Sequence, residues 1–275
     1  MTQRSRIPQL LGTLSLATFV ALAAACAPAA TAGPGTGAGP EPADPPTTAR
    51  ALVERMRAQH ADSFYRTLTF RQLNTIYTSA GEQASEWLER QVVPGLLRID
   101  FVAPVADGSG ILFRNDSAYT FQNGSLTLSV PQLHPLLLLA ADVYAIPVDT
   151  TVAKLARIGV DTTVFRADEW KGRPVWVAGA TPGDSTSTQL WVDADSMLLV
   201  RLFHRQPGPG GRAPRTVEYQ FEYQEVEGFQ VPREILFLRD GKPFFRETYV
   251  DQRPNASIGD SVFVPARWAE SVPAR

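Results

Sequence analysis

The chain has 275 residues, with 26 Lys or Arg against 28 Asp or Glu, so its formal net charge is −2. A balance this close to neutral, without a basic stripe, argues against a nucleic-acid partner and against binding to anionic lipid headgroups. The single cysteine has no partner for an internal disulfide, so a packed core must stabilise the fold, and the chain is long enough to form one.

The N-terminus has the order of an export signal. Two arginines precede a mainly apolar run, residues 10–25, and small residues lead into Cys26. The strongly apolar part is too short for a transmembrane helix. We therefore expect residues 1–25 to be a lipoprotein signal peptide and Cys26 to carry a lipid anchor. Ala23 stands where such signals usually have Leu, so an ordinary secretory signal that discards Cys26 is the alternative. Both predict a bacterial cell-envelope protein.

Residues 26–49 differ in composition from the rest of the chain. They are mostly Ala, Pro, Gly and Thr, with almost no large apolar side chain. This composition predicts a flexible tether between the membrane and a folded part. No second linker of this kind follows, and no internal repeat is evident, so the sequence predicts one domain over residues 50–270.

The first half of this domain begins with a helix and continues as strands. Ala51–His60 has the apolar spacing of a helix of nearly three turns. The pattern then changes to a period of two, and Asn123-Gly124 is a strong hairpin-turn signal. We expect strands at Leu97–Phe101, Ile111–Arg114, Tyr119–Gln122 and Leu126–Val130.

Two helices are expected between the halves. His134–Tyr144 has Pro135 near its start and is apolar almost all round. Thr150–Ile158 is expected to have Asp149 or Thr150 as its cap. The second half returns to alternating strands with short turns, at Val175–Ala178, Gln189–Asp193, Met197–Phe203, Val217–Gln224, Phe229–Arg239 and Pro243–Asp251.

The expected elements indicate a fold class. A sheet with one apolar face must cover that face, and the helices are the only candidates to do so. With roughly a dozen strands joined by short turns, a strongly curved sheet or incomplete barrel is favoured. We expect a mainly β protein in which a single curved antiparallel sheet forms a half-open barrel around a few helices.

Several segments resemble the LolA/LolB-like outer-membrane lipoprotein-sorting superfamily, and the resemblance covers most of residues 50–268. They are Pro94–Phe101, Asn115–Gly124, Gln189–Asp193, Val231–Ile235 and the closing Phe263–Trp268. The resemblance implies a LolA-like half-barrel with helices as a lid over a hydrophobic cavity that takes acyl chains. Membrane-anchored acceptors of the superfamily are lipidated and its soluble carriers are not, so Cys26 is similar to the acceptor type. Ala27, in place of Asp, implies the outer membrane more than the inner.

The apolar residues of the domain allow two interpretations. They fill the core of a closed barrel, as most such residues do, or they line a lipid-sized cavity between the sheet and the helices. Together with the resemblance, the cavity is favoured. The candidate acyl-binding residues are Leu97, Ile99, Phe101, Phe113, Phe121, Leu136, Leu137, Leu139, Trp176 and Trp191.

No motif for catalysis or metal binding stands out. His60, His134 and His204 lack metal-ligand spacing and are expected to be surface or capping groups. The segment Asp193-Ala-Asp195 lacks the Gly and Glu of a calcium loop and is interpreted as a turn. Because no hydrolase motif is present either, we expect a protein that is not an enzyme and that holds no metal or cofactor.

Two functions stay open at this point. The first is a monomer, anchored at the periplasmic face of the outer membrane, that binds lipid or lipoprotein acyl chains in lipoprotein sorting and localisation. The second is an envelope sensor or scaffold module of the same fold that binds another protein. Charging the cavity separates them, because Leu137→Asp abolishes lipid binding but spares a partner that docks on the surface.

Overall fold

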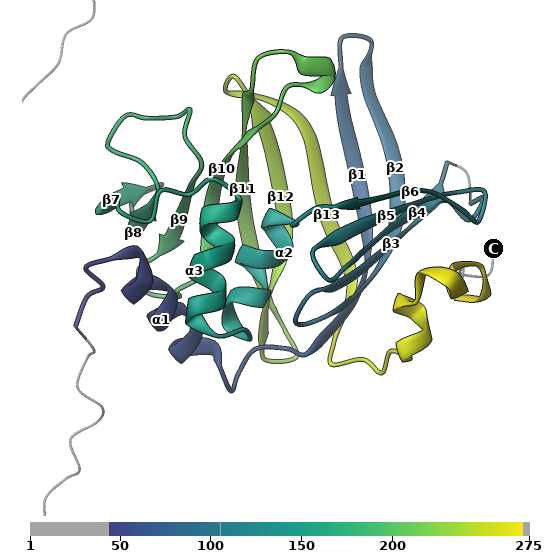
Figure 1. Cartoon of the computed structure of the whole chain (residues 1–275), viewed down its shortest axis with the longest axis horizontal. Helices are drawn as coiled ribbons and strands as arrows, with labels where there is room; N and C mark the ends of the chain where they lie inside the picture. Colours follow the sequence, from purple (N-terminus) through teal and green to yellow (C-terminus); the bar gives the residue numbers. More distant parts are fainter. Residues whose placement is uncertain (1–43, 105, 272–275) are drawn as a thin grey trace, which may run out of the picture. The chain divides into compact units, whose positions relative to one another are not determined.

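The computed structural model describes residues 44–104 and 106–271. Cys26, the expected signal peptide and most of the expected tether lie outside these residues. Within the described residues, thirteen antiparallel strands form one open, curved sheet (Figure 1). The mainly β fold class expected from the period-two pattern is therefore confirmed.

Consecutive strands pair in this sheet, with the exception of β6 and β7, which lie at opposite edges. The order of the strands is β6-β5-β4-β3-β2-β1-β13-β12-β11-β10-β9-β8-β7. Their bounds are β1 Thr67–Thr78, β2 Gly81–Val92, β3 Leu96–Ala103, β4 Gly110–Arg114, β5 Ser117–Gln122, β6 Ser125–Pro131, β7 Phe165–Trp170, β8 Arg173–Ala178, β9 Gln189–Asp193, β10 Leu199–Gln206, β11 Arg215–Val226, β12 Phe229–Arg239 and β13 Lys242–Pro254.

This topology puts the helices inside the curl of the sheet. The first strand, β1, pairs with the last, β13, so β6 and β7 are left as the two edges. The chain crosses from one edge to the other through α2 (Pro135–Ala140), the 3₁₀ turn η1 (Asp142–Tyr144) and α3 (Val148–Arg157). Figure 1 shows this crossing in front of the strands β10 to β13. The crossing covers the apolar concave face while leaving the barrel open.

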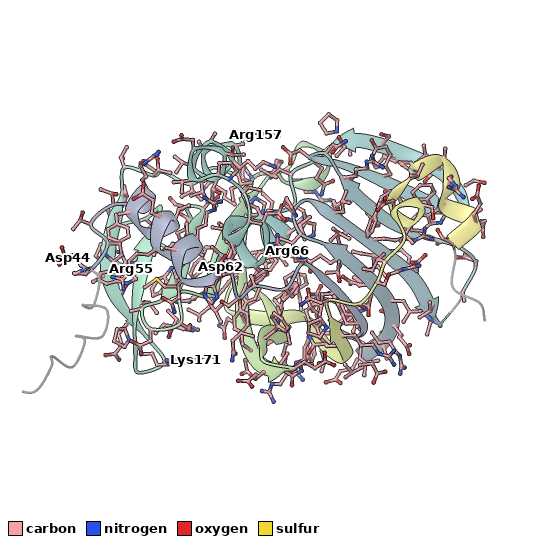
Figure 2. All side chains as sticks on the ribbon, turned by 90° about the horizontal axis from the view of Figure 1, so that it is seen from below. Asp44, Arg55, Asp62, Arg66, Arg157 and Lys171 are labelled. Carbon is pink, nitrogen blue, oxygen red and sulfur yellow. The ribbon has the colours of Figure 1, made fainter. Side chains whose placement is uncertain are left out.

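The N-terminal helix α1 (Ala49–His60) completes the helical layer. The Thr48 hydroxyl accepts a hydrogen bond of 3.0 Å from an N–H of the first turn and so caps the helix. Leu52 and Met56 on its inner face are fully buried and join the same core as the concave side of the sheet. Figure 2 shows α1 from below, near the label of Arg55. None of the described helices combines the length and apolarity needed to cross a membrane.

The convex side of β3 to β5 is covered by the C-terminal segment. Its 3₁₀ turns η3 (Asp260–Phe263) and η4 (Pro265–Ser271) bring the Trp268 ring onto that of Phe121, with the centroids 4.1 Å apart. Gly110 on β4 permits this contact, because an added Cβ would lie 2.8 Å from the Trp268 ring and 2.1 Å from a backbone oxygen. The absence of a side chain at this position therefore lets the segment pack against the sheet.

A buried ion pair lies beneath Trp268. Arg98 on β3 is fully buried, and its guanidinium carbon lies 3.7 Å from the centroid of the Trp268 ring. It donates to both carboxylate oxygens of Asp100, and it also donates to the Trp268 carbonyl at 3.1 Å and to the Ser271 hydroxyl at 2.6 Å. Arg90 donates to the same carboxylate. These bonds pin the C-terminal segment to the sheet.

The expected hairpins are confirmed at their turns. Asn123, Lys171 and Asp240 adopt φ values of 50°, 51° and 51°, and each is followed by a glycine with positive φ. Such left-handed pairs are what two-residue turns between twisted strands require. One strand boundary is wrong, because Met197 has a φ of 52° in the turn and β10 starts only at Leu199.

The expected helices need two corrections. The helix expected over His134–Tyr144 is interrupted after α2, and the Asp142 carboxylate there accepts a hydrogen bond of 2.8 Å from the N–H of Gly95. A cap at Asp149 or Thr150 is wrong, because α3 starts at Val148 without a side-chain cap. Asp149 instead pairs with Arg50 of α1 at 2.7 Å.

Candidate functional site

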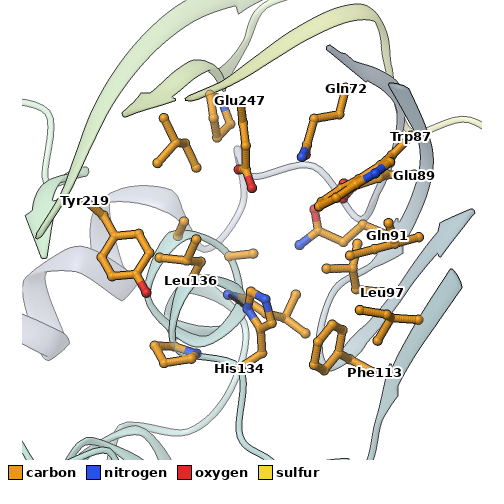
Figure 3. Close-up of a pocket in the computed structure, with 18 of the residues that line it drawn as sticks. Gln72, Trp87, Glu89, Gln91, Leu97, Phe113, His134, Leu136, Tyr219 and Glu247 are labelled. Atoms are coloured by element: carbon orange, nitrogen blue, oxygen red, sulfur yellow. Dashed lines mark hydrogen bonds between the residues drawn. The ribbon is translucent and has the colours of Figure 1, made fainter. Parts of the chain in front are cut away.

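A cavity of about 640 Å³ lies between the concave face of the sheet and α2. Strands from β1 to β4 and from β10 to β13 contribute to its wall, together with the segment 132–141 (Figure 3). Most of the lining side chains are aliphatic or aromatic. The volume falls within the range of roughly 300–1,000 Å³ that is usual for ligand pockets.

Helix α2 forms one wall because its sequence is helical and apolar on every side. Pro135 occupies the first turn, where its missing N–H costs no hydrogen bond. The His134 Nδ1 accepts a hydrogen bond of 3.1 Å from the N–H of Leu137 and caps the helix. Leu136 and Leu137 line the cavity, whereas Leu139 is fully buried in the core behind them. The expectation that this histidine is a capping group is confirmed.

Aromatic rings surround the part of the cavity that faces the strands. Trp87 on β2 lies 5.9 Å from Phe245 on β13, and Phe245 lies 5.0 Å from Phe237 on β12, measured between ring centroids. Phe70 and Tyr249 face each other across the β1–β13 pair with centroids 4.7 Å apart. These rings give the cavity an apolar wall.

An acidic strip crosses this wall on three adjacent strands near the centre of the sheet. Gln72 on β1, Glu89 and Gln91 on β2, and Glu247 on β13 all line the cavity. In Figure 3 the Gln72 side chain lies between those of Glu247 and Glu89. Glu247 accepts a hydrogen bond of 2.7 Å from the Tyr249 hydroxyl. The cavity is therefore lined mainly by apolar side chains, apart from this acidic strip.

Both carboxyl groups of the strip have a raised pKa. Burial raises the pKa of Glu247 to about 7, while the Tyr249 hydroxyl and the Gln72 amide lower it in part. Burial, together with the charges of Glu247 and Asp100, holds the pKa of Glu89 well above its usual range. Removing a carboxylate from water without a cation beside it is the common cause.

Two histidines also line the cavity: His134, which precedes α2, and His204 on β10. Burial lowers the pKa of His134 to about 4, and the charge of His204 adds to the effect. Gln206 donates to the Tyr219 hydroxyl at 2.9 Å and lies 3.3 Å from the His204 Nδ1. Among the described residues, no three His, Cys, Asp or Glu side chains come together as metal ligands would.

Five of the ten candidate acyl-binding residues line the cavity: Leu97, Ile99, Phe113, Leu136 and Leu137. The other five lie elsewhere. Phe101 packs against Trp87, with the ring centroids 5.1 Å apart, and Phe121 lies under the C-terminal segment. Leu139 is buried in the core, and Trp176 is partly buried against it. Trp191 belongs to a cluster with Phe203 and Val177 on the opposite face. Trp191 is separated from the cavity because successive residues of a strand point to opposite faces.

Sequence reasoning missed the residues of β1 and β2 that line the cavity. Both strands carry polar side chains at buried positions, Gln72 and Asn74 on β1 and Glu89 and Gln91 on β2. These residues interrupt the alternation that marks a half-buried strand. The one residue that could have indicated this wall is Trp87, because it shares one strand face with Glu89 and Gln91.

No family model matches the chain, and no curated protein matches it. Among solved structures, it is similar to a domain from Vibrio parahaemolyticus described as an outer membrane lipoprotein-sorting protein, with a TM-score of 0.53, 8% identity, and coverage of 80% of this chain and 97% of that chain. A DUF1329 family protein from Desulfovibrio piger has a TM-score of 0.52, 14% identity, and coverage of 81% and 98%. For a LolA superfamily protein from Nitrosomonas europaea the TM-score is 0.49, with 13% identity and coverage of 79% and 98%.

At identities this low, the similarity concerns the fold alone. It extends over nearly the whole length of the compared domains. The chain has the fold of the lipoprotein-sorting domain, and the LolA-like fold implied by the sequence resemblance is confirmed.

Proposed function

We propose that this protein binds acyl chains of a lipid or lipoprotein in the cavity between the sheet and α2, without covalent chemistry. The cavity itself carries the proposal: about 640 Å³ lined mainly by apolar side chains. Each methylene removed from water contributes about 0.8 kcal/mol, so even a single chain of moderate length gains enough free energy to bind.

The sorting role and the location belong to the same proposal. A protein with a lipidated Cys26 and a tether of residues 26–49 holds such a cavity near the membrane surface, at the periplasmic face of the outer membrane. A tethered binder suits a receiver of lipoproteins better than a diffusing shuttle.

The test charges the cavity wall. Leu137→Asp introduces a carboxylate into the apolar lining, where Leu137 is 8% exposed, and should abolish displacement of the neutral dye Nile red by monopalmitoyl glycerol. Leu126→Asp is the matched control, because Leu126 lies on β6 outside the cavity and is 51% exposed. Equal displacement in the two variants and the wild type would contradict the proposal.

A second variant separates loss of binding from loss of the fold. Ala140→Phe places a ring from α2 into the cavity without adding charge, since Ala140 is one of the lining residues. The variant should fold, as judged by circular dichroism, and should bind the dye more weakly than the wild type.

A second candidate function, binding of another protein, is favoured by the edge strand β6. Leu126 and Leu128 on this strand are 51% and 52% exposed. An edge strand with exposed apolar residues can pair with a strand of a partner. Under this reading Leu126→Asp removes a co-purifying envelope protein while Leu137→Asp retains it.

A further inference from the structure

The two carboxyl groups of the cavity have no cation of the chain beside them. Glu89 and Glu247 are 5% and 8% exposed and project from β2 and β13, the strands on either side of β1. The described residues that line the cavity include no Lys or Arg. Buried carboxylates are almost always paired with a cation or fully hydrogen-bonded.

Glu89 is the sharper case of the two. Its neighbour Glu247 has the Tyr249 hydroxyl as a donor, but no described residue donates a hydrogen bond to the Glu89 carboxyl. The Gln91 amide, 7% exposed and on the same strand face, is likewise without a partner among the described residues. Figure 3 shows both side chains directed into the cavity. Polar groups that line a cavity without a partner in the chain are available to a ligand.

We propose that the acidic strip binds the protonated primary amine of an amphiphile whose apolar chain occupies the rest of the cavity. An ammonium group has three donors and no acceptor, which matches the carboxyl oxygens of Glu89 and Glu247. The ligand class deepens the proposed function and rests on it.

The aromatic wall supports the same ligand. Trp87 shares the strand face of Glu89, and the rings of Phe70 and Tyr249 pack together at 4.7 Å beside the strip. Faces of aromatic rings attract cations, and the attraction grows when the cation is removed from water. Carboxylates and aromatic rings together are therefore a suitable environment for an ammonium group.

Charge also decides which amphiphiles the cavity rejects. A fatty-acid carboxylate would place a third acidic group beside Glu89 and Glu247, with no Lys or Arg in the described lining to balance it. An uncharged alcohol of the same length would gain the apolar contacts only. An adjacent ammonium lowers the pKa of a buried carboxyl group, so binding of the amine releases protons to solvent.

The experiment compares three amphiphiles of one chain length below their micelle concentrations: dodecylamine, dodecanol and dodecanoate. Isothermal titration calorimetry at pH 7 should show dodecylamine binding roughly tenfold or more tighter than dodecanol, as expected for charge-assisted hydrogen bonds, and dodecanoate binding weakest. Repeating the titration in buffers of different ionisation enthalpy should show proton release with the amine alone.

Isosteric variants assign the preference to the strip. Glu89→Gln and Glu247→Gln should each reduce the ratio of amine to alcohol affinity, and the double variant should bring it close to one while dodecanol still binds. Glu82→Gln is the matched control, since Glu82 lies on the same strand but is exposed and outside the cavity lining. It should leave the ratio unchanged.

The outcomes separate this inference from the function on which it rests. Equal affinity for amine and alcohol, tighter binding of dodecanoate, or a ratio that survives the double variant overturns the inference and leaves acyl-chain binding intact. Failure of all three amphiphiles to bind overturns both.

Two sources can supply such an ammonium, a lipid headgroup and the free amino terminus of a diacylated lipopeptide. Lysophosphatidylethanolamine compared with lysophosphatidylglycerol tests the first, and the lipopeptide compared with its N-acetylated form tests the second. A preference for the amine-bearing member in either pair supports the inference, and no preference in both contradicts it.

Discussion

At the scale of single residues, the molecule treats two groups of buried charges in opposite ways. The convex-side carboxylate of Asp100 accepts hydrogen bonds from Arg98 and Arg90, so its charge is compensated inside the chain. The concave-side carboxyls of Glu89 and Glu247 have no cation. The first group stabilises the fold, because its charges are paired, whereas the second costs stability when ionised and is available for binding.

Arg98→Ala is predicted to destabilise the protein by roughly 3–5 kcal/mol, because it leaves Asp100 buried with a weakened partner and frees the C-terminal segment. Urea unfolding measures the change. Arg233→Ala is the control, since its pair with Glu222 has both side chains about half exposed, at 54% and 45%. That variant should change stability by less than about 1 kcal/mol. Similar losses in the two variants would contradict the assigned role of Arg98.

Glu247 should make stability depend on pH. Its folded pKa of about 7 lies above the ordinary glutamate value of 4.5, so the folded state holds the proton more tightly than the unfolded state. Its contribution to stability is therefore full below pH 4.5 and is lost as the pH rises to 7. Glu247→Gln should become more stable relative to the wild type across this window, by on the order of 2–3 kcal/mol.

The comparison with the variant is needed because other groups titrate nearby. Glu89 on β2 faces Glu247 and acts in the same direction, whereas His134 and His204, whose pKa values are lowered by burial, lose stability as the pH falls. Tyr249 and Gln72 hydrogen-bond to Glu247 without titrating in this range. Unfolding in urea at pH 5 and pH 8 measures the difference, and a difference that does not change with pH would contradict the prediction.

At the scale of elements, α2 depends on its cap. His134 closes a helix of only six residues and also packs edge-on against Phe113, with the ring centroids 4.4 Å apart. His134→Ala should cost about 1 kcal/mol in thermal unfolding and speed hydrogen exchange at the Leu137 amide, because that N–H loses its acceptor. His134→Asn, which keeps an acceptor, should cost less. Equal exchange rates in the two variants would argue against the cap.

The same scale shows which elements could be predicted from the sequence. The hairpins closed by Asn123-Gly124, Lys171-Gly172 and Asp240-Gly241 were predictable, because a left-handed turn leaves a local residue signal. The strands β1 and β2 were not, because Gln72 and Glu89 occupy the buried face that alternation assigns to apolar residues. Buried polar residues thus interrupt the pattern at the proposed site, which is where local rules are expected to fail.

At the scale of the whole molecule, the fold was predictable and the contents of the barrel were not. Period two along the strands and a single helical crossing lead to a curved sheet around helices. Whether Leu97 and Trp191 share a space depends on which side of the sheet each one faces, and strand registers beyond local turns settle that. Whether a cavity forms depends on the distance between α2 and the sheet. No residue pattern in the sequence determines that distance.

The central claim is that the cavity holds an acyl chain. Native mass spectrometry of the full chain, purified gently from bacterial membranes, measures this directly. The wild type should carry one acyl-bearing molecule per chain, and Ala140→Phe, with its cavity partly filled, should carry much less. Wild-type protein that is consistently free of bound lipid or lipoprotein, or an equal load on the filled variant, would contradict the account.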